Sequence, residues 1–129
     1  MGIHPTAIIS PDAFLAAQVS VGAYSIIGEH VVLGAGCRVD EHVVIQGPTR
    51  IGQRCRFFPF GSIGFPPQDL KYKGEPTELI VGDDNIFREY VTVHRGTAQG
   101  GGRTVIGNHN FVMAYSHIAH DCILGNHVI

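Results

Sequence analysis

The chain has 129 residues, 17 glycines and a formal net charge of −2. This length suits one domain with a single core, and we expect residues 1–129 to form it. The near-neutral charge excludes the basic surface typical of proteins that bind nucleic acid. There is no long apolar run and no basic-then-apolar leader, so we expect a cytoplasmic protein that does not enter the membrane.

From the N-terminus onward, a large apolar residue recurs at every sixth position. The pattern holds without a break at Ile3, Ile9, Leu15, Val21, Ile27, Leu33, Val39, Ile45, Ile51, Phe57 and Ile63. A compact residue such as Ala7, Val19 or Cys37 stands four positions after each large one. Alternate side chains of a strand share a face, so the compact residue and the next large residue both point inward from one short strand. The residues after them form a corner.

Three such repeats make one triangular coil, and stacked coils pair their backbones with the coils above and below. The sequence therefore predicts an all-β parallel β-helix of about six coils. A β-sandwich would show runs of period two broken at irregular intervals instead. The general rule for parallel crossovers predicts a right-handed coil. All three cysteines, Cys37, Cys55 and Cys122, take the compact inward position and are interpreted as small apolar fillers.

Two segments interrupt the repeat. The first runs from Phe65 to Glu78 and reads FPPQDLKYKGEPTE, which lacks the inward pair and is expected to leave the prism as a loop. The second runs from His94 to Val105 and contains RGTAQGGG. It lacks the Gly-Lys-Ser/Thr ending of a phosphate-binding loop, so we interpret it as a flexible excursion. Solenoid proteins usually carry their function on such insertions.

None of the eight histidines takes an inward position. Those at 30, 42, 109 and 127 fall at corners and His4 lies near the chain end, so solvated positions explain them. His94, His117 and His120 differ because they lie beside the insertions or within the segment HIAHDC. A neutral imidazole can take a proton from a hydroxyl, and a carboxylate such as that of Asp121 can hold its tautomer. The spacing permits this pairing without requiring it, so the residues alone leave the cluster open to either a functional or a structural interpretation.

Several motifs together resemble one enzyme family over nearly the whole chain. They are HPTAII at 4–9, QDLKYKGEPT at 68–77, HRGT and QGGG within 94–102, and HIAHDCILGN at 117–126. These segments resemble the acyl-carrier-protein-dependent UDP-N-acetylglucosamine O-acyltransferases, which begin lipid A biosynthesis. The resemblance implies a left-handed β-helix that forms a homotrimer, with active sites between subunits and no metal or dissociable cofactor.

The resemblance also implies roles for particular residues. His120 would be the general base that deprotonates the sugar 3-hydroxyl for attack on a 3-hydroxyacyl thioester, and Asp121 would assist it. His117 would contact the sugar. Gln68, Asp69 and Lys71 would lie on the loop that holds the sugar and the diphosphate, where a lysine cation suits the phosphate charge.

The chain departs from the family at its C-terminal side, because it ends at Ile129. The resemblance implies that further coils and a helical domain would follow, bringing an oxyanion-stabilising glycine amide and the arginines that bind nucleotide and acyl carrier protein. We therefore expect little turnover from this chain alone, and binding of the carrier protein is in doubt.

Two other functions stay open. A zinc enzyme of the γ-carbonic-anhydrase type could use His94, His117 and His120 as three nitrogen ligands. The spacing from His117 to His120 and the QDLKYKGEPT loop disagree with that family. The other alternative is a non-catalytic trimeric scaffold or assembly building block.

Overall fold

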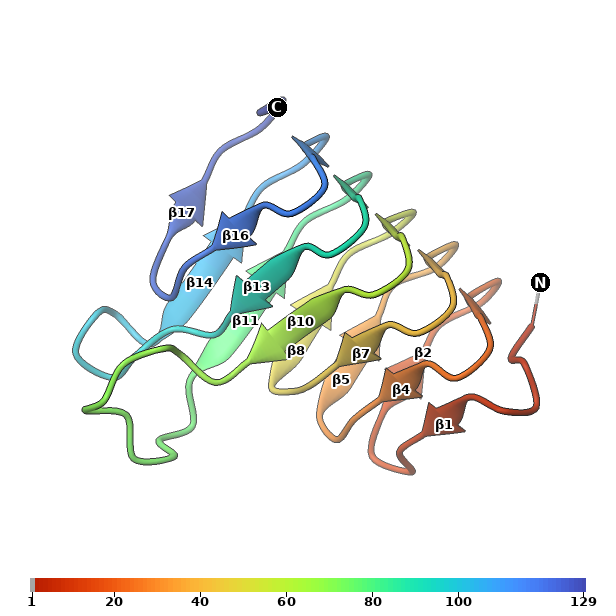
Figure 1. Ribbon diagram of the computed structural model, residues 1–129, viewed down its shortest axis with the longest axis horizontal. Coiled ribbons are helices and arrows are strands. Elements are labelled where there is room, and N and C mark those ends of the chain that lie inside the picture. Colours follow the sequence, from red (N-terminus) through yellow and green to blue (C-terminus); the bar gives the residue numbers. More distant parts are fainter. Residues whose placement is uncertain (1) are drawn as a thin grey trace.

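The computed structural model describes residues 2–129, which form a three-sided prism of short parallel strands (Figure 1). The β1 sheet contains β1 (Ile8–Ile9), β4 (Ile26–Ile27), β7 (Val44–Ile45), β10 (Ser62–Phe65), β13 (Thr92–His94) and β16 (His117–Ile118). The β2 sheet contains β2 (Phe14–Leu15), β5 (Val31–Leu33), β8 (Thr49–Ile51), β11 (Glu78–Val81), β14 (Arg103–Ile106) and β17 (Ile123–Leu124). The β3 sheet contains β3 (Ser20–Val21), β6 (Arg38–Val39), β9 (Arg56–Phe57), β12 (Ile86–Phe87) and β15 (Phe111–Val112). The chain visits the three sheets in rotation, which confirms the predicted parallel β-helix of about six coils.

The hand of the coil is left, as the family resemblance implies and contrary to the general rule for crossovers. In Figure 1 the nearer strands of the β1 sheet and the fainter strands of the β2 sheet run in opposite directions, and the chain winds left-handedly from N to C. The right-handed rule applies to twisted strands joined by long crossovers. Here most strands have two residues and tight corners join them, so little strand twist is available to favour the right hand.

The corners depend on residues in the left-handed backbone region. Twelve non-glycine residues have φ between 55° and 69°: Gln18, Tyr24, His30, His42, Arg54, Phe60, Asp84, Tyr90, His109, Tyr115, Asp121 and His127. Histidine and aspartate enter this region more readily than most residues. The four histidines predicted to be solvated turn residues are all in this set, and all four are exposed.

The six-residue pattern builds the core as predicted. The large inward residues of the central coils, such as Ile27, Ile45 and Ile63, are fully buried. At the N-terminal end the inward residues are less buried, because no coil covers them from below, and Ile3 is 44% exposed. The thiols of Cys37 and Cys55 are buried and that of Cys122 is half-buried, and all three are free. These positions agree with the predicted role of the cysteines as inward fillers.

Both insertions leave the prism where the chain passes from the β1 sheet to the β2 sheet, here called the insertion corner. The first insertion lies between β10 and β11 as predicted, but it covers residues 66–77, because the expected ends Phe65 and Glu78 belong to those two strands. The second insertion is shorter than expected and covers only residues 95–102. Arg103, Thr104 and Val105 belong to β14, where they pair with β11 in the coil below.

Candidate active site

Three segments far apart in the sequence meet along the insertion corner. The first insertion belongs to one coil and the second insertion to the next. The turn at residues 119–122 is the same corner of the last coil, between β16 and β17. Figure 1 shows the two loops projecting side by side from this edge of the prism. The fold thus gathers the motifs that the sequence singled out for function on one edge.

His120 and Asp121 form a hydrogen-bonded pair at this turn. The backbone of Asp121 has φ 65°, and both side chains project outward. His120 Nδ1 lies 2.9 Å from Asp121 Oδ2. About one-third of the His120 side chain is exposed, compared with 17% of the Asp121 side chain. The pairing that the spacing only permitted is therefore present in the structure.

The second insertion holds the Asp121 carboxylate in place. The Thr97 amide donates to Oδ1 at 2.7 Å, and the Thr97 hydroxyl donates to Oδ2 at 2.6 Å. Gly100 packs so closely that a Cβ there would lie 2.2 Å from Oδ2. Partial burial acts to raise the pKa of Asp121, but the hydrogen bonds from Thr97 and His120 outweigh it and lower that pKa.

This arrangement selects one tautomer of His120. An ionised carboxylate can only accept hydrogen bonds, so His120 Nδ1 must carry the proton that it shares with Asp121. The lone pair of the neutral ring then lies on Nε2, which makes no hydrogen bond to another part of residues 2–129. A histidine held in this way can accept a proton at Nε2 while the carboxylate stabilises the resulting imidazolium.

His117 points outward from β16, next to the pair. Its Nδ1 lies 2.7 Å from the Thr92 hydroxyl of the preceding coil, and its ring meets that of His94 edge-on at 5.1 Å. Burial lowers the pKa of His117, and the nearby His94 and His120 lower it further. The neutral form of His117 is therefore favoured at neutral pH.

The three predicted loop residues lie on the first insertion. Gln68 and Lys71 are exposed, and Leu70 between them is fully exposed at the tip. Asp69 accepts a hydrogen bond from the Lys71 amide at 2.9 Å, so its carboxylate also shapes the loop. Within residues 2–129, no hydrogen bond or ion pair joins these side chains to His117, His120 or Asp121. The fold places them on the same corner, and their contact with a substrate remains a prediction.

The zinc alternative finds little support in the geometry. In the part of the chain that the structure describes, no three histidine, cysteine or acidic side chains converge as metal ligands would.

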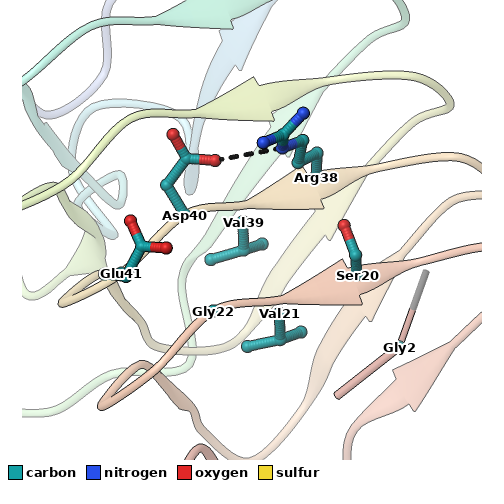
Figure 2. Close-up of a pocket in the computed structure, with 8 residues that line it drawn as sticks. All are labelled: Gly2, Ser20, Val21, Gly22, Arg38, Val39, Asp40 and Glu41. Carbon is teal, nitrogen blue, oxygen red and sulfur yellow. Dashed lines mark ion pairs between the residues drawn. The ribbon is translucent and has the colours of Figure 1, made fainter. Parts of the chain in front are cut away.

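One hollow on the described surface lies away from these residues. It has a volume of about 410 Å³ and lies over β3 and β6, in the first coils. Figure 2 shows Arg38 pointing toward Asp40 across this hollow, with Ser20 nearby. None of the predicted site residues lines it. The exposed Gln68 and Lys71 and the partly exposed His120 place the candidate site on an open edge of the prism.

The chain is similar in sequence to known acyltransferases. Residues 103–129 match the family described as bacterial transferase hexapeptide (six repeats). The acyl-[acyl-carrier-protein]--UDP-N-acetylglucosamine O-acyltransferase of Thermodesulfovibrio yellowstonii is 59% identical over 127 residues, which are 98% of this chain and 49% of that protein. The chain thus spans about half the length of the curated relatives it matches.

Solved structures of acyltransferases are similar to this chain in both sequence and fold. LpxA from Acinetobacter baumannii superposes with a TM-score of 0.95 at 52% identity, covering 96% of this chain and 48% of that one. The UDP-N-acetylglucosamine O-acyltransferase from Moraxella catarrhalis gives 0.95 at 49% identity, covering 97% and 49%. Fold and repeat together define the class of left-handed parallel β-helices built from hexapeptide repeats. Within that class the chain is similar to the UDP-N-acetylglucosamine O-acyltransferases, which confirms the resemblance predicted from the sequence.

Sequence reasoning missed the residues that support the site. Thr92 and Thr97 carried no predicted role, although Thr97 lies in the HRGT segment that contributed to the resemblance. Their partners are 25 and 24 residues away, and each contact depends on how an insertion or a coil folds. No local pattern in the sequence signals such a contact. Residues 2–129 also contain no helix long and apolar enough to cross a membrane.

Proposed function

We propose that this chain provides the general base and part of the sugar-binding surface of a cytoplasmic acyltransferase. The enzyme would transfer a 3-hydroxyacyl group from acyl carrier protein to the 3-hydroxyl of UDP-N-acetylglucosamine, the first step of lipid A biosynthesis. The names of its relatives state the donor and the acceptor. The observation that carries the proposal is the chain of hydrogen bonds from Thr97 through Asp121 to His120, which leaves Nε2 of His120 available as a base.

In the proposed reaction, His120 Nε2 takes the proton of the sugar 3-hydroxyl as the oxygen attacks the thioester carbonyl carbon. The C–S bond then breaks, and the imidazolium returns the proton to the departing thiolate. Asp121 stays ionised and stabilises the imidazolium. General-base assistance of this kind is worth roughly a hundred- to ten-thousand-fold in rate.

Other residues of the insertion corner would bind the acceptor. Lys71 supplies a cation for the diphosphate, with Gln68 and Asp69 beside it on the exposed first insertion. His117, in its favoured neutral form, would hydrogen-bond to the sugar through its Nε2. Because the candidate site is an open edge, we propose that a homotrimer completes it, with the neighbouring subunit forming the opposite wall. The reaction requires no metal or dissociable cofactor.

The matched variants His120→Asn and His30→Asn test this proposal. Both residues lie at the insertion corner, but His30 is an exposed turn residue four coils away. We expect His120→Asn to lower acyl transfer to UDP-N-acetylglucosamine by about a hundredfold or more, because asparagine cannot act as a base. Its affinity for UDP-N-acetylglucosamine, measured by titration calorimetry, should change little, and His30→Asn should resemble the wild type.

Three outcomes would contradict the proposal. Transfer that is unaltered in His120→Asn would remove His120 as the base. A wild-type chain that neither binds UDP-N-acetylglucosamine nor transfers an acyl group would favour the scaffold alternative. Stoichiometric zinc in the purified protein would revive the metal-dependent alternative.

A further inference from the structure

One buried arginine connects the two insertions to the prism. Arg95 opens the second insertion and is only 8% exposed. Its Nη1 donates to the carbonyl oxygens of Gly64 at 2.6 Å and Gly47 at 3.2 Å. Its Nη2 donates to the Tyr72 hydroxyl at 3.2 Å, in the middle of the first insertion. One side chain thus reaches two lower coils and the loop that carries the predicted sugar-binding residues.

The groups that accept hydrogen bonds from Arg95 are themselves fixed in position by backbone geometry and by further hydrogen bonds. Gly64 has φ +78°, and a Cβ there would lie 2.2 Å from the Gln46 carbonyl oxygen, so only glycine fits where it presents its carbonyl group. Tyr72 in turn donates to the Glu75 carbonyl oxygen at 2.7 Å. The Arg95 amide also donates to the Phe65 carbonyl oxygen at 2.9 Å, at the point where the first insertion begins.

Arg95 has no carboxylate partner among residues 2–129. None of the ion pairs of the described chain includes it, and its buried Nε makes no hydrogen bond. A buried guanidinium without a counter-ion is costly, so ion pairing does not explain its presence. What it provides is a rigid planar fork that binds several oxygen atoms at once, which lysine cannot reproduce.

We infer that Arg95 is a positioning residue that holds the first insertion against the prism, so that Gln68 and Lys71 are preorganised for ligand. The assignment of UDP-N-acetylglucosamine as that ligand rests on the proposed function. Without the Arg95 guanidinium, the backbone hydrogen bond to Phe65 at the base of the loop remains, but the hydrogen bond that holds the Tyr72 hydroxyl is lost. The loop would then sample other positions, in which Gln68 and Lys71 are no longer held in one arrangement for a ligand.

Arg95→Gln and Tyr72→Phe test the inference, with Arg103→Gln as the matched control. Arg103 lies at the other end of the second insertion and makes only an exposed ion pair with Glu78 at 3.6 Å. The first readout is the rate of tryptic cleavage after Lys73, on the exposed loop, in the full chain well below its melting temperature. Cleavage tracks the open population of a segment, and we expect it to rise by about tenfold in Arg95→Gln and by less in Tyr72→Phe.

The second readout is the affinity for UDP-N-acetylglucosamine. If the population of the loop conformation that can bind the ligand falls to a tenth, the apparent Kd and the KM rise by about tenfold. The value of kcat at saturation changes little. Arg103→Gln should leave both readouts unchanged. Should Arg95→Gln fail to fold, Tyr72→Phe alone decides, because it retains the buried arginine.

Cleavage rates equal to wild type in both variants would overturn the inference. So would a fall in kcat with an unchanged KM. The cleavage readout needs no ligand, so it still tests loop positioning if the wild type proves unable to bind UDP-N-acetylglucosamine. Failure of the wild type to bind UDP-N-acetylglucosamine would refute the proposed function. The positioning role of Arg95 would then be judged from the cleavage rates alone.

Discussion

At the scale of single residues, Thr97 has a more specific role than its place in a glycine-rich loop suggests. Its amide and hydroxyl bind both oxygens of the Asp121 carboxylate. Asp121 in turn fixes the tautomer of His120. A threonine therefore supports the candidate base through one intermediate side chain, without itself facing the position where a substrate would react.

We predict that Thr97→Val destabilises the protein and Thr97→Ser does not. Valine keeps the backbone donor but loses the hydroxyl, and a hydrogen bond to a charged group is typically worth about 1.5–3 kcal/mol. Serine keeps both donors. The measurement is the free energy of unfolding in urea at pH 7 and pH 3.

The pH dependence of this effect has a definite sign. The folded state lowers the pKa of Asp121, so its stabilising contribution is complete above the ordinary aspartate value of about 3.9 and is lost as pH falls through the lower folded value. The deficit of Thr97→Val should therefore be largest at neutral pH and shrink in acid. An equal deficit at both pH values would show that the hydroxyl contributes by packing and not by binding the carboxylate.

At the scale of elements, one corner of the prism carries a column of stacked aromatic rings. Tyr24, His42, Phe60, Tyr90 and Tyr115 lie on successive coils between the β3 and β1 sheets, with ring centroids 5.1–5.3 Å apart. Each has a positive φ, which costs an ordinary residue about 1–2 kcal/mol, and stacking returns about 0.5–1.5 kcal/mol for each pair. The column thus offsets the backbone strain of its own corner.

We predict that Tyr90→Gly is more stable than Tyr90→Ala by about 1 kcal/mol. Both substitutions remove the stacks with Phe60 and Tyr115, but only glycine relieves the strain of the left-handed backbone. This reverses the usual order, in which glycine is less stable than alanine by about 0.5–1 kcal/mol. Thermal unfolding checks the order, and Ser20 in strand β3 is the control position, where alanine should be the more stable of the two. The usual order at position 90 would mean that the corner tolerates alanine without strain.

At the scale of the whole molecule, the prism behaves as a stack in which the inward side chains of each coil pack mainly against those of the neighbouring coils. Central coils are covered on both sides and end coils on one. The phenylalanines Phe57 and Phe87 illustrate the central packing, because their rings stack at 4.9 Å with planes 1° apart. The same inward isoleucine should therefore contribute very differently in the middle and at the N-terminal end.

Ile45→Ala and Ile3→Ala make this comparison with identical chemistry. Ile45 is fully buried, so its loss leaves a cavity and should cost about 2–5 kcal/mol of unfolding free energy. Ile3 is 44% exposed, and its replacement should cost under about 1 kcal/mol. Equal losses at the two positions would contradict the view that neighbouring coils provide the burial.

The sequence by itself determined which side chains enter the prism, how many coils stack and where the two insertions leave. The six-residue repeat encodes these features locally, because each strand buries one compact and one large side chain wherever it lies in the chain. It also marked His120 and Asp121, because they are adjacent and fall at a corner outside the repeat. The repeat alone left the hand of the coil open, and the left hand that the family resemblance implied is confirmed by the structure. Only the tertiary structure decided the end of the second insertion at residue 102 and the contacts of Thr97 and Arg95. Those contacts join residues 23 to 48 positions apart, so they exist only after the insertions have folded against the coils.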